Sequence, residues 1–317
     1  MTPRETRAMA VSAAMALALM AAALWVNRSG DLPAAIFWGV RVPEALTAAL
    51  VGGALGLSGL LFQLVLRNPL ADPYVLGVAG GSTFGAVAAT LALGSVAAVG
   101  GLPLRAAAAF AGGILTLFGL LRLTSGRPMS LLLGGVIANT AFAALARVIT
   151  VWFSPSQLAY VTSFLIGFIP TPPLWAPLAL CVPTLYALWR FSSRGRGLDL
   201  LLLSDDEASS TGLAVRPLRT EALVLGTLLA ALAVALCGMI GFVGLVVPHA
   251  ARAIIGRRHR ALVPASFLLG AAFLLGAHTL GKVLSGTWFL PVGVYTSLVG
   301  APAFLFLLVR GRREDAP

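Results

Sequence analysis

Residues 44–66 read EALTAALVGGALGLSGLLFQLVL, a run of 23 residues whose one charged side chain is Glu44 at its start. About 20 consecutive apolar residues are enough for a helix to cross a bilayer, so this stretch predicts a membrane-spanning helix. Small side chains crowd its centre, where they would let a second helix backbone approach closely. These small residues are Gly52, Gly53, Gly56, Ser58 and Gly59.

The rest of the chain has the same character. Of its 317 residues, 59% are hydrophobic and 10% are charged, whereas a soluble domain carries about 25% charged residues. The mean hydropathy is +0.95. Such a composition excludes a disordered chain, and two cysteines, Cys181 and Cys237, exclude a disulfide scaffold. We therefore expect a polytopic membrane protein.

The apolar runs predict an all-α protein of about ten transmembrane helices, which form a single domain over residues 1–317. A shorter apolar piece, 160–169, predicts a re-entrant or interfacial helix before a cluster of prolines. The eighth run is short and contains Pro248, so its limits are uncertain. The predicted segments are 8–26, 44–66, 75–97, 104–121, 131–152, 174–190, 221–239, 242–256, 262–284 and 291–310.

The basic residues indicate an orientation. They sit in small groups between the apolar runs, a pattern that argues against nucleic-acid binding, which favours a basic stripe. With the N-terminus inside and one crossing per segment, 17 of the 22 basic residues fall on the inner side. This bias predicts that both termini are cytoplasmic. Residues 9–26 could be a secretory signal, but the run is long and lacks a clear cleavage motif, so we expect a retained first helix.

The stretch RNPLADPYVLG, residues 67–77, is followed by GGST at 80–83. Each proline disfavours helix at the residue before it, and the side chains of Asn68 and Asp72 can bond the nearby backbone. We expect a rigid, non-helical corner at the inner membrane boundary, packed against protein or a water-filled cavity. The alternative is an ordinary tight turn.

The longest polar stretch, residues 194–219, contains LDLLLLSDDEA. Ser204 is a predicted N-cap, Glu207 closes a capping box, and Gly212 is expected to end the helix. The four leucines before Ser204 indicate an interface, because exposed apolar clusters usually mark one. A short helix here could dock into a groove on a soluble partner; the alternative is a solvated connector.

Catalytic motifs are absent from the sequence: it contains no HExxH, GxSxG or phosphate-binding GxxxxGK[ST] pattern. We therefore expect no enzymatic activity, no metal site and no cofactor in this chain. His249 is predicted to make a structural hydrogen bond. His278 lies within an apolar segment, where a polar group is costly unless it is partnered or wetted, so it is a possible pathway residue together with His249.

Several motifs occur in a characteristic order. After Arg41-Val42-Pro43 and RNPLADPYVLG come LLLGGVIAN (131–139), LSDDEASSTGLAV (203–215), GFVGLVVPH (241–249), LPVGV (290–294) and LVGAP (298–302). From about residue 41 to 310 the chain resembles the permease subunit of type II ATP-binding-cassette importers, the FecCD/BtuC-like permeases for iron chelates and vitamin B12.

The resemblance implies a homodimer in the bacterial cytoplasmic membrane, with the substrate path along the dimer axis. Two cytoplasmic ATPases would bind ATP and Mg²⁺, and a periplasmic or lipoprotein binding protein would deliver an iron-siderophore, haem or a corrinoid. The implied gate comprises Gly80, Gly81, Ser82 and Thr83 with 126–130, among them Pro128, Met129 and Ser130. The implied ATPase contact, within 198–213, comprises Leu200, Leu203, Ser204, Asp205, Asp206, Glu207, Ala208 and Gly212. The implied docking residues for the binding protein are Arg41 and Lys282.

Three positions depart from the family pattern. Glu44 replaces a second basic residue, His278 replaces an acidic residue of the ninth helix, and Phe289 replaces a glutamate. These changes bear on the docking surface and on the cargo. The alternative function is a secondary transporter or channel without an ATPase, which predicts intramembrane carboxylates; here Glu44, Asp72 and Glu221 lie only at segment ends.

Overall fold

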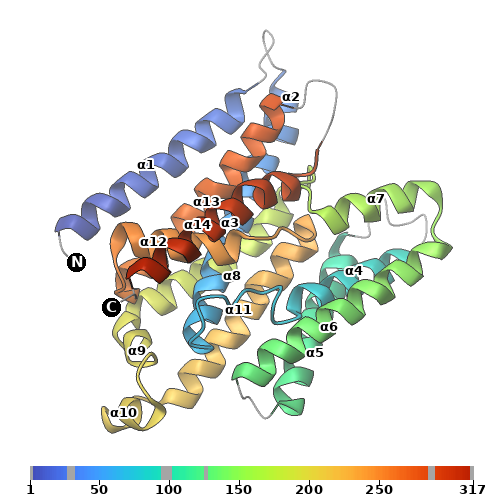
Figure 1. The fold of residues 1–317 in the computed structure, drawn as a ribbon. Helices are drawn as coiled ribbons and strands as arrows, with labels where there is room; N and C mark the ends of the chain where they lie inside the picture. Colours follow the sequence, from blue (N-terminus) through green and yellow to red (C-terminus); the bar gives the residue numbers. More distant parts are fainter. Residues whose placement is uncertain (1–2, 27–32, 94–101, 125–127, 285–289, 315–317) are drawn as a thin grey trace.

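The computed structural model describes residues 3–26, 33–93, 102–124, 128–284 and 290–314. Every regular element in these ranges is a helix (Figure 1), which confirms the all-α prediction. Each of the ten predicted apolar segments overlaps a helix, although the limits differ by up to six residues and residues 94–97 of the predicted segment 75–97 lie outside the described ranges. These helices are α1 (Pro3–Trp25), α3 (Val42–Val65), α4 (Val78–Leu93), α5 (Leu102–Leu123), α6 (Pro128–Ile149), α8 (Trp175–Ser193), α11 (Val215–Cys237), α12 (Val243–Ile255), α13 (His259–Leu284) and α14 (Val292–Glu314).

Shorter elements connect these helices. The uncertain eighth segment is the 13-residue helix α12, with Pro248 inside it. The short apolar piece predicted at 160–169 belongs to α7, which begins earlier, at a proline, and ends at Gly167 with φ 85°. The short elements are α2 (Ala34–Ile36), the π-helix η1 (Phe37–Arg41), the 3₁₀ turn η3 (Thr150–Trp152), α7 (Pro155–Ile166), α9 (Gly195–Leu200) and α10 (Asp205–Ser210).

Fewer helices than expected are long and apolar enough to cross a membrane. Within the described ranges there are six: Glu5–Trp25, Ala34–Val65, Leu104–Leu123, Met129–Trp152, Val215–Cys237 and His259–Leu284. The 13 residues of α12 span only about 20 Å, against about 30 Å of hydrocarbon. Length excludes helices such as α4 and α12, whereas α8 has 19 residues and is excluded because it is less apolar.

Helix α3 forms the centre of the molecule. Of its 24 residues, 19 are buried, and α8, α11, α12 and α13 pack around it (Figure 1). A Cβ atom added at Gly52 would lie 2.7 Å from Cβ of Leu274 on α13, and one added at Gly59 would overlap the backbone of Gly244 on α12. The small residues of α3 thus serve close packing.

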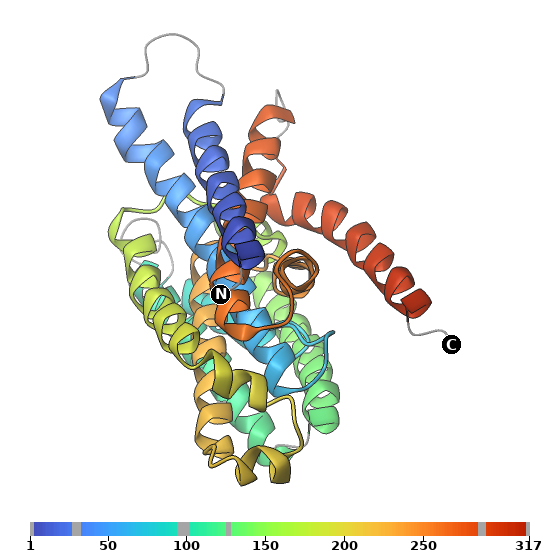
Figure 2. The same cartoon turned by 90° about the vertical axis from the view of Figure 1, so that its left-hand side faces the viewer.

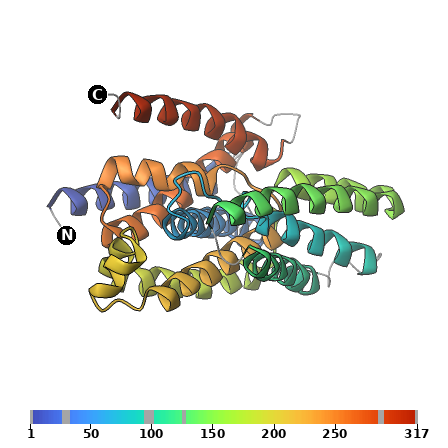
Figure 3. The same cartoon turned by 60° about the horizontal axis from the view of Figure 1, so that its bottom comes forward.

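Two parts of the molecule flank this centre. Helices α4, α5 and α6 pack together on one side, and α14 lies along the opposite edge (Figure 3). Figure 2 shows α14 leaving the bundle at an angle. In Figure 1 the start of α1, the end of α14 and α9 all lie at the lower left. Chain ends and polar short helices therefore share one side of the bundle.

Candidate functional site

The polar stretch after α8 folds into α9 and α10, which project from the foot of the bundle in Figure 1. The side-chain Oγ of Ser204 accepts the backbone N–H of Glu207 at 3.3 Å. The Glu207 carboxylate in turn accepts the backbone N–H of Ser204 at 3.0 Å. Gly212, with φ 83°, follows the end of α10. The predicted capping box and stop signal are confirmed, although the segment is two helices rather than one.

The four leucines of this segment do not form one exposed cluster. Leu201 and Ala208 are buried in the core, whereas Leu202 and Leu203 are exposed, and Leu200 is half-buried. The difference arises because 201–203 form a turn that directs successive side chains to different sides. Two of the four leucines therefore anchor the segment, and the other two are available to a partner.

Asp205, the first residue of α10, is held by two arginines. The guanidinium of Arg219 donates to both carboxylate oxygens at 2.7 and 2.9 Å, and that of Arg67 donates to Oδ1 at 2.7 Å. These contacts, led by the Arg219 hydrogen bond, lower the pKa of Asp205 to about 2. Asp205 therefore anchors α10 within the chain. The sequence pattern alone did not distinguish this structural role from a contact with a partner protein.

Arg67 joins this segment to the loop that follows α3. Besides Asp205, it donates to the backbone carbonyls of Leu201, at 3.1 Å, and Leu203. Within its own loop, Asn68 accepts the N–H of Leu70 at 2.9 Å, and Asp72 accepts that of Tyr74 at 3.2 Å. The predicted non-helical corner is confirmed, and Arg67 ties it to the residues between α9 and α10. The pairing of Arg67 with Asp205 could not be predicted from a local sequence pattern, because the two residues are too far apart in the chain.

The remaining acids of α10 have different surroundings. Glu207 is engaged in the cap, whereas Asp206 is exposed and has no hydrogen bond or ion pair in the described part of the chain. The face available to another protein thus comprises Asp206, Leu202 and Leu203.

At the start of the segment, Asp199 accepts the backbone N–H of His259 at 3.0 Å and lies 2.7 Å from its Nδ1, which ties α9 to α13.

The predicted gate residues separate into two levels. Gly80–Thr83 lie in the first turns of α4 and are buried, with Gly80 against Asn139 of α6. Pro128, Met129 and Ser130 begin α6, where Met129 is 79% exposed. Nine residues along α6 correspond to about 13 Å, so one protomer does not bring the two stretches together. Residues 126–127 of the predicted stretch lie outside the described ranges.

Polar groups near the first stretch lack partners. Among the described residues, the buried Ser82 Oγ, Thr83 Oγ1 and Asn139 Oδ1 have no hydrogen bond. A buried polar atom without a partner is costly, and at membrane depth polar groups usually face protein or a wet cavity. Ser82 Oγ lies against Gly113 of α5 and Asn139 Oδ1 against Gly80 of α4, so these polar atoms are distributed over the contacts of α4 with both neighbouring helices.

His249 makes the structural hydrogen bond that the sequence predicted. Its Nδ1 lies 3.0 Å from the carbonyl oxygen of Leu245, one turn earlier on α12. Its ring also packs edge-on against Phe304, with centroids 6.0 Å apart. His249 thereby links α12 to α14.

His278 belongs to a cluster at the end of the bundle opposite α9 and α10, which we call the Glu44 cluster: Glu44, Thr171, His278 and Lys282. The Glu44 carboxylate accepts Lys282 Nζ at 2.5 Å and the Thr171 hydroxyl at 2.8 Å. His278 Nε2 lies 3.7 Å from it, an ion-pair distance when the ring is protonated. Two of the positions that depart from the family pattern, 44 and 278, therefore face each other.

The two predicted docking residues both have intramolecular contacts. Arg41 donates to the carbonyls of Leu24 and Val26 at the end of α1, at 2.9 and 2.6 Å. The charge of Lys282 is compensated by Glu44. The third departure, Phe289, lies outside the described residues. Both basic side chains are therefore engaged by other groups of the same chain.

Long apolar helices packed on small residues, with polar short helices at one end, define a multi-pass membrane protein. The model of the FecCD transport family matches residues 6–310. The chain belongs to this family of transport permeases.

Relatives in several organisms cover most of the chain. The Fe(3+) dicitrate transport system permease FecD of Escherichia coli is 39% identical, over 86% of this chain and 84% of its own. The hemin transport system permease HmuU of Yersinia pestis is 36% identical, over 94% and 90%. The vitamin B12 import system permease BtuC of Klebsiella pneumoniae is 37% identical, over 91% and 86%.

A solved structure shares the fold. A chain described as a metal-chelate type ABC transporter in an inward-facing conformation superposes with a TM-score of 0.87 at 29% identity. The match covers 96% of this chain and 99% of that one. The helix arrangement is therefore that of ABC transporter permeases.

Proposed function

We propose that this chain is the membrane-spanning permease subunit of an ABC importer, and that residues 198–213 transmit the motion of separate ATPases. The observation that carries the proposal is the way α10 is held. Arg67 and Arg219 fix Asp205 from two parts of the chain, while Asp206, Leu202 and Leu203 stay exposed. A rigidly mounted element with a free face suits force transmission between proteins.

The cargo that we propose is a metal chelate: an iron-siderophore, haem or a corrinoid. Support comes from the relatives, whose names refer to iron dicitrate, hemin and vitamin B12. Transport would follow alternating access, in which ATP binding to the partner subunits shifts the population of inward- and outward-open states. ATP and Mg²⁺ would belong to those partners.

We further propose a homodimer in the bacterial cytoplasmic membrane, with both chain ends inside. Helix α6 supports this arrangement, because it exposes Met129, Leu133 and Ile137 along its length. A second copy on this face would bring another α6 close, and the separated gate stretches of two protomers could then act at one axis. The shared side of both chain ends and α9 agrees with the bias in basic residues.

A binding protein would deliver the cargo to the end that carries the Glu44 cluster. Since Glu44 compensates Lys282 and Arg41 is bound to α1, we expect docking to depend weakly on salt. The three carboxylates near the segments give little support to the alternative, a secondary transporter. Glu44 pairs with Lys282 and Glu221 pairs with Arg190, and Asp72 accepts the backbone N–H of Tyr74 in the corner after α3.

The test compares two different changes at Asp206 in a complex reconstituted from the permease and its ABC ATPase partner. Asp206→Lys changes the free face and should uncouple ATP hydrolysis from uptake while leaving the fold intact. Asp206→Asn with Arg216→Gln, which removes one charge of each sign, is the mild control. If the double variant Asp206→Lys/Leu203→Glu coupled ATP hydrolysis to uptake as the wild-type chain does, the assignment of this face to the ATPase would be refuted.

A further inference from the structure

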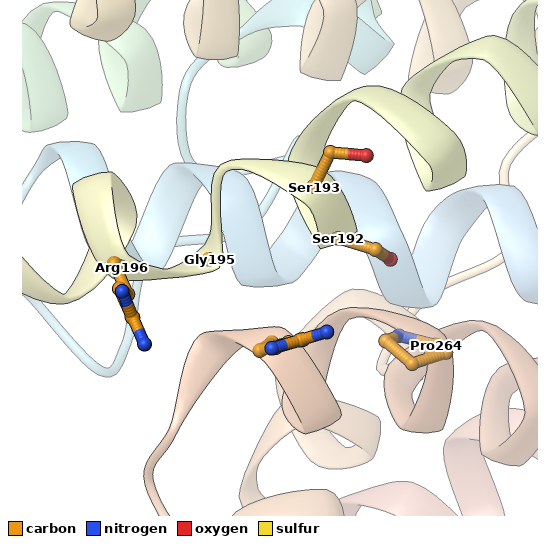
Figure 4. A pocket seen from close by; sticks show the side chains of 6 residues that line it. Ser192, Ser193, Gly195, Arg196 and Pro264 are labelled. Atoms are coloured by element: carbon orange, nitrogen blue, oxygen red, sulfur yellow. The ribbon is translucent and has the colours of Figure 1, made fainter. Parts of the chain in front are cut away.

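A pocket of about 560 Å³ lies where the end of α8 and the start of α9 face the start of α13. Figure 4 shows Arg196 reaching from α9 toward the helix that carries Pro264. The lining residues are Ser192, Ser193, Gly195, Arg196, Arg260 and Pro264. None of them belongs to the exposed face of α10 assigned above to the ATPase.

The pocket is cationic. It is lined by two arginines and by no acidic residue, and neither arginine forms an ion pair in the part of the chain that the structure describes. Asp199, one turn beyond Arg196, is already engaged by His259. Both arginines are exposed, and an anion in the cavity would be attracted by both guanidinium groups at once.

The backbone at Gly195 brings the start of α9 close to the start of α13. A Cβ atom on Gly195 would lie 2.5 Å from the backbone nitrogen of Arg260 and 2.8 Å from its Cβ. Only glycine lets α9 approach the start of α13 this closely. The hydroxyl of Ser193 donates to the carbonyl of Trp189 at 2.7 Å, while Ser192 has a hydroxyl available as a donor. Guanidinium and hydroxyl donors of this kind suit a phosphate group.

The surface that adjoins the pocket is apolar and faces outward. On α8, Val182, Tyr186 and Trp189 are exposed at helical spacing, and Ser193 continues this stripe into the pocket. Tyr and Trp are enriched where a bilayer meets water. The pocket therefore lies one turn beyond the exposed Tyr186 and Trp189 of α8, where a bilayer surface at the level of these two rings would place its phosphate groups.

We propose that the Arg196–Arg260 pocket binds the phosphate group of an anionic phospholipid, whose acyl chains lie along the exposed face of α8. Basic pockets beside transmembrane helices on the cytoplasmic side commonly bind lipid head groups. The phospholipid, rather than free phosphate, is favoured because the pocket is continuous with the apolar stripe. The bound lipid would tie α9 to the membrane surface, and with it residues 198–213, to which the proposed function assigns contact with the ATPase.

The test uses the full chain in neutral detergent, titrated with phosphatidylglycerol, phosphatidylcholine or inorganic phosphate and followed by native mass spectrometry. Phosphatidylglycerol should bind most tightly, and Arg196→Gln/Arg260→Gln should weaken it by about thirtyfold. Arg194→Gln/Arg258→Gln removes the same charge from the same region and should retain binding. Equal loss in both pairs, equal affinity for phosphatidylcholine, or inorganic phosphate binding as tightly as phosphatidylglycerol would each overturn the proposal.

A second measurement needs no arginine variant. Trp189 lies on the proposed acyl-chain path, so brominated phosphatidylglycerol should quench its fluorescence more than brominated phosphatidylcholine does. The Trp189 signal is obtained as the difference between the wild-type chain and Trp189→Phe. Equal quenching by the two lipids would contradict the pocket's preference for an anionic head group.

Discussion

Arg67 donates to the carboxylate of Asp205 across 138 positions of sequence, with Nη2 and Oδ1 2.7 Å apart. The contact joins the non-helical corner after α3 to the first residue of α10. Since Arg67 also holds the carbonyls of Leu201 and Leu203, one side chain sets the position of the whole turn before α10. The contact therefore ties the end of the core helix α3 to the turn before α10.

Arg67→Gln should loosen this turn. The side chains of Arg67 and Asp205 are 37% and 54% exposed, so we expect a cost of only about 1 kcal/mol, or about fivefold faster local opening. Hydrogen exchange of residues 201–210 in the detergent-solubilised chain measures it. Arg216→Gln, an exposed arginine near the segment, is the control, and equal exchange in the two variants would show that Arg67 does not hold the turn.

Asp205 should titrate below its ordinary range. Its pKa falls to about 2 because Arg219 and then Arg67 donate to the carboxylate, whereas an unfolded aspartate has a pKa of about 3.9. The ion pairs therefore stabilise α10 above about pH 4 and are lost as the pH falls toward 2. Carboxyl carbon shifts of labelled aspartate, assigned with Asp205→Asn, report the titration. Arg219→Gln should raise the pKa, and an unshifted pKa in the wild-type chain would contradict the bidentate pair.

Glu44 and Lys282 should show strong coupling. Glu44→Gln leaves a partly buried lysine without its counter-charge, for which we expect a loss of roughly 1–3 kcal/mol, less than for a fully buried pair because Lys282 is 25% exposed. Glu44→Gln/Lys282→Met removes both charges and should cost less than the two single changes together. Thermal unfolding in detergent gives the comparison. Simple additivity of the single changes would mean that the pair contributes no interaction energy.

Gly59→Ala should destabilise the protein, because the added methyl group would overlap the backbone of Gly244. Overpacking of this kind costs about 1–3 kcal/mol. Gly119→Ala is the matched control: it is exposed on α5 and has nothing within 4 Å of the new methyl group, so alanine's higher helix propensity should stabilise it slightly. The midpoints of thermal unfolding should move in opposite directions. A Gly59→Ala protein as stable as the wild type would show that α3 and α12 can separate at little cost.

The sequence predicted the helices well because helix formation at membrane depth depends on local features. A long apolar run satisfies its own backbone hydrogen bonds only as a helix, which is why each predicted segment appears in the fold. The cap of Ser204 and Glu207 and the stop at Gly212 were equally local. By contrast, the run of four leucines predicted one exposed cluster, and the turn at 201–203 divided it.

The ion pairs and the lipid pocket were beyond local prediction. Asp205 could be recognised as an acidic first-turn residue, but only the fold brings Arg67 and Arg219 to it. In the same way, residues 44 and 278 stood out singly as departures from a family pattern, and the structure shows that they face each other.

By itself, the amino-acid sequence determined that this protein is a set of apolar, membrane-spanning helices and roughly where along the chain they lie, because hydrophobicity, capping and proline act over a few neighbouring residues. The tertiary structure alone decided which charges meet, which leucines are exposed and which arginines share a pocket. Those outcomes depend on the packing of helices far apart in the chain, and glycines at their contacts set the distances.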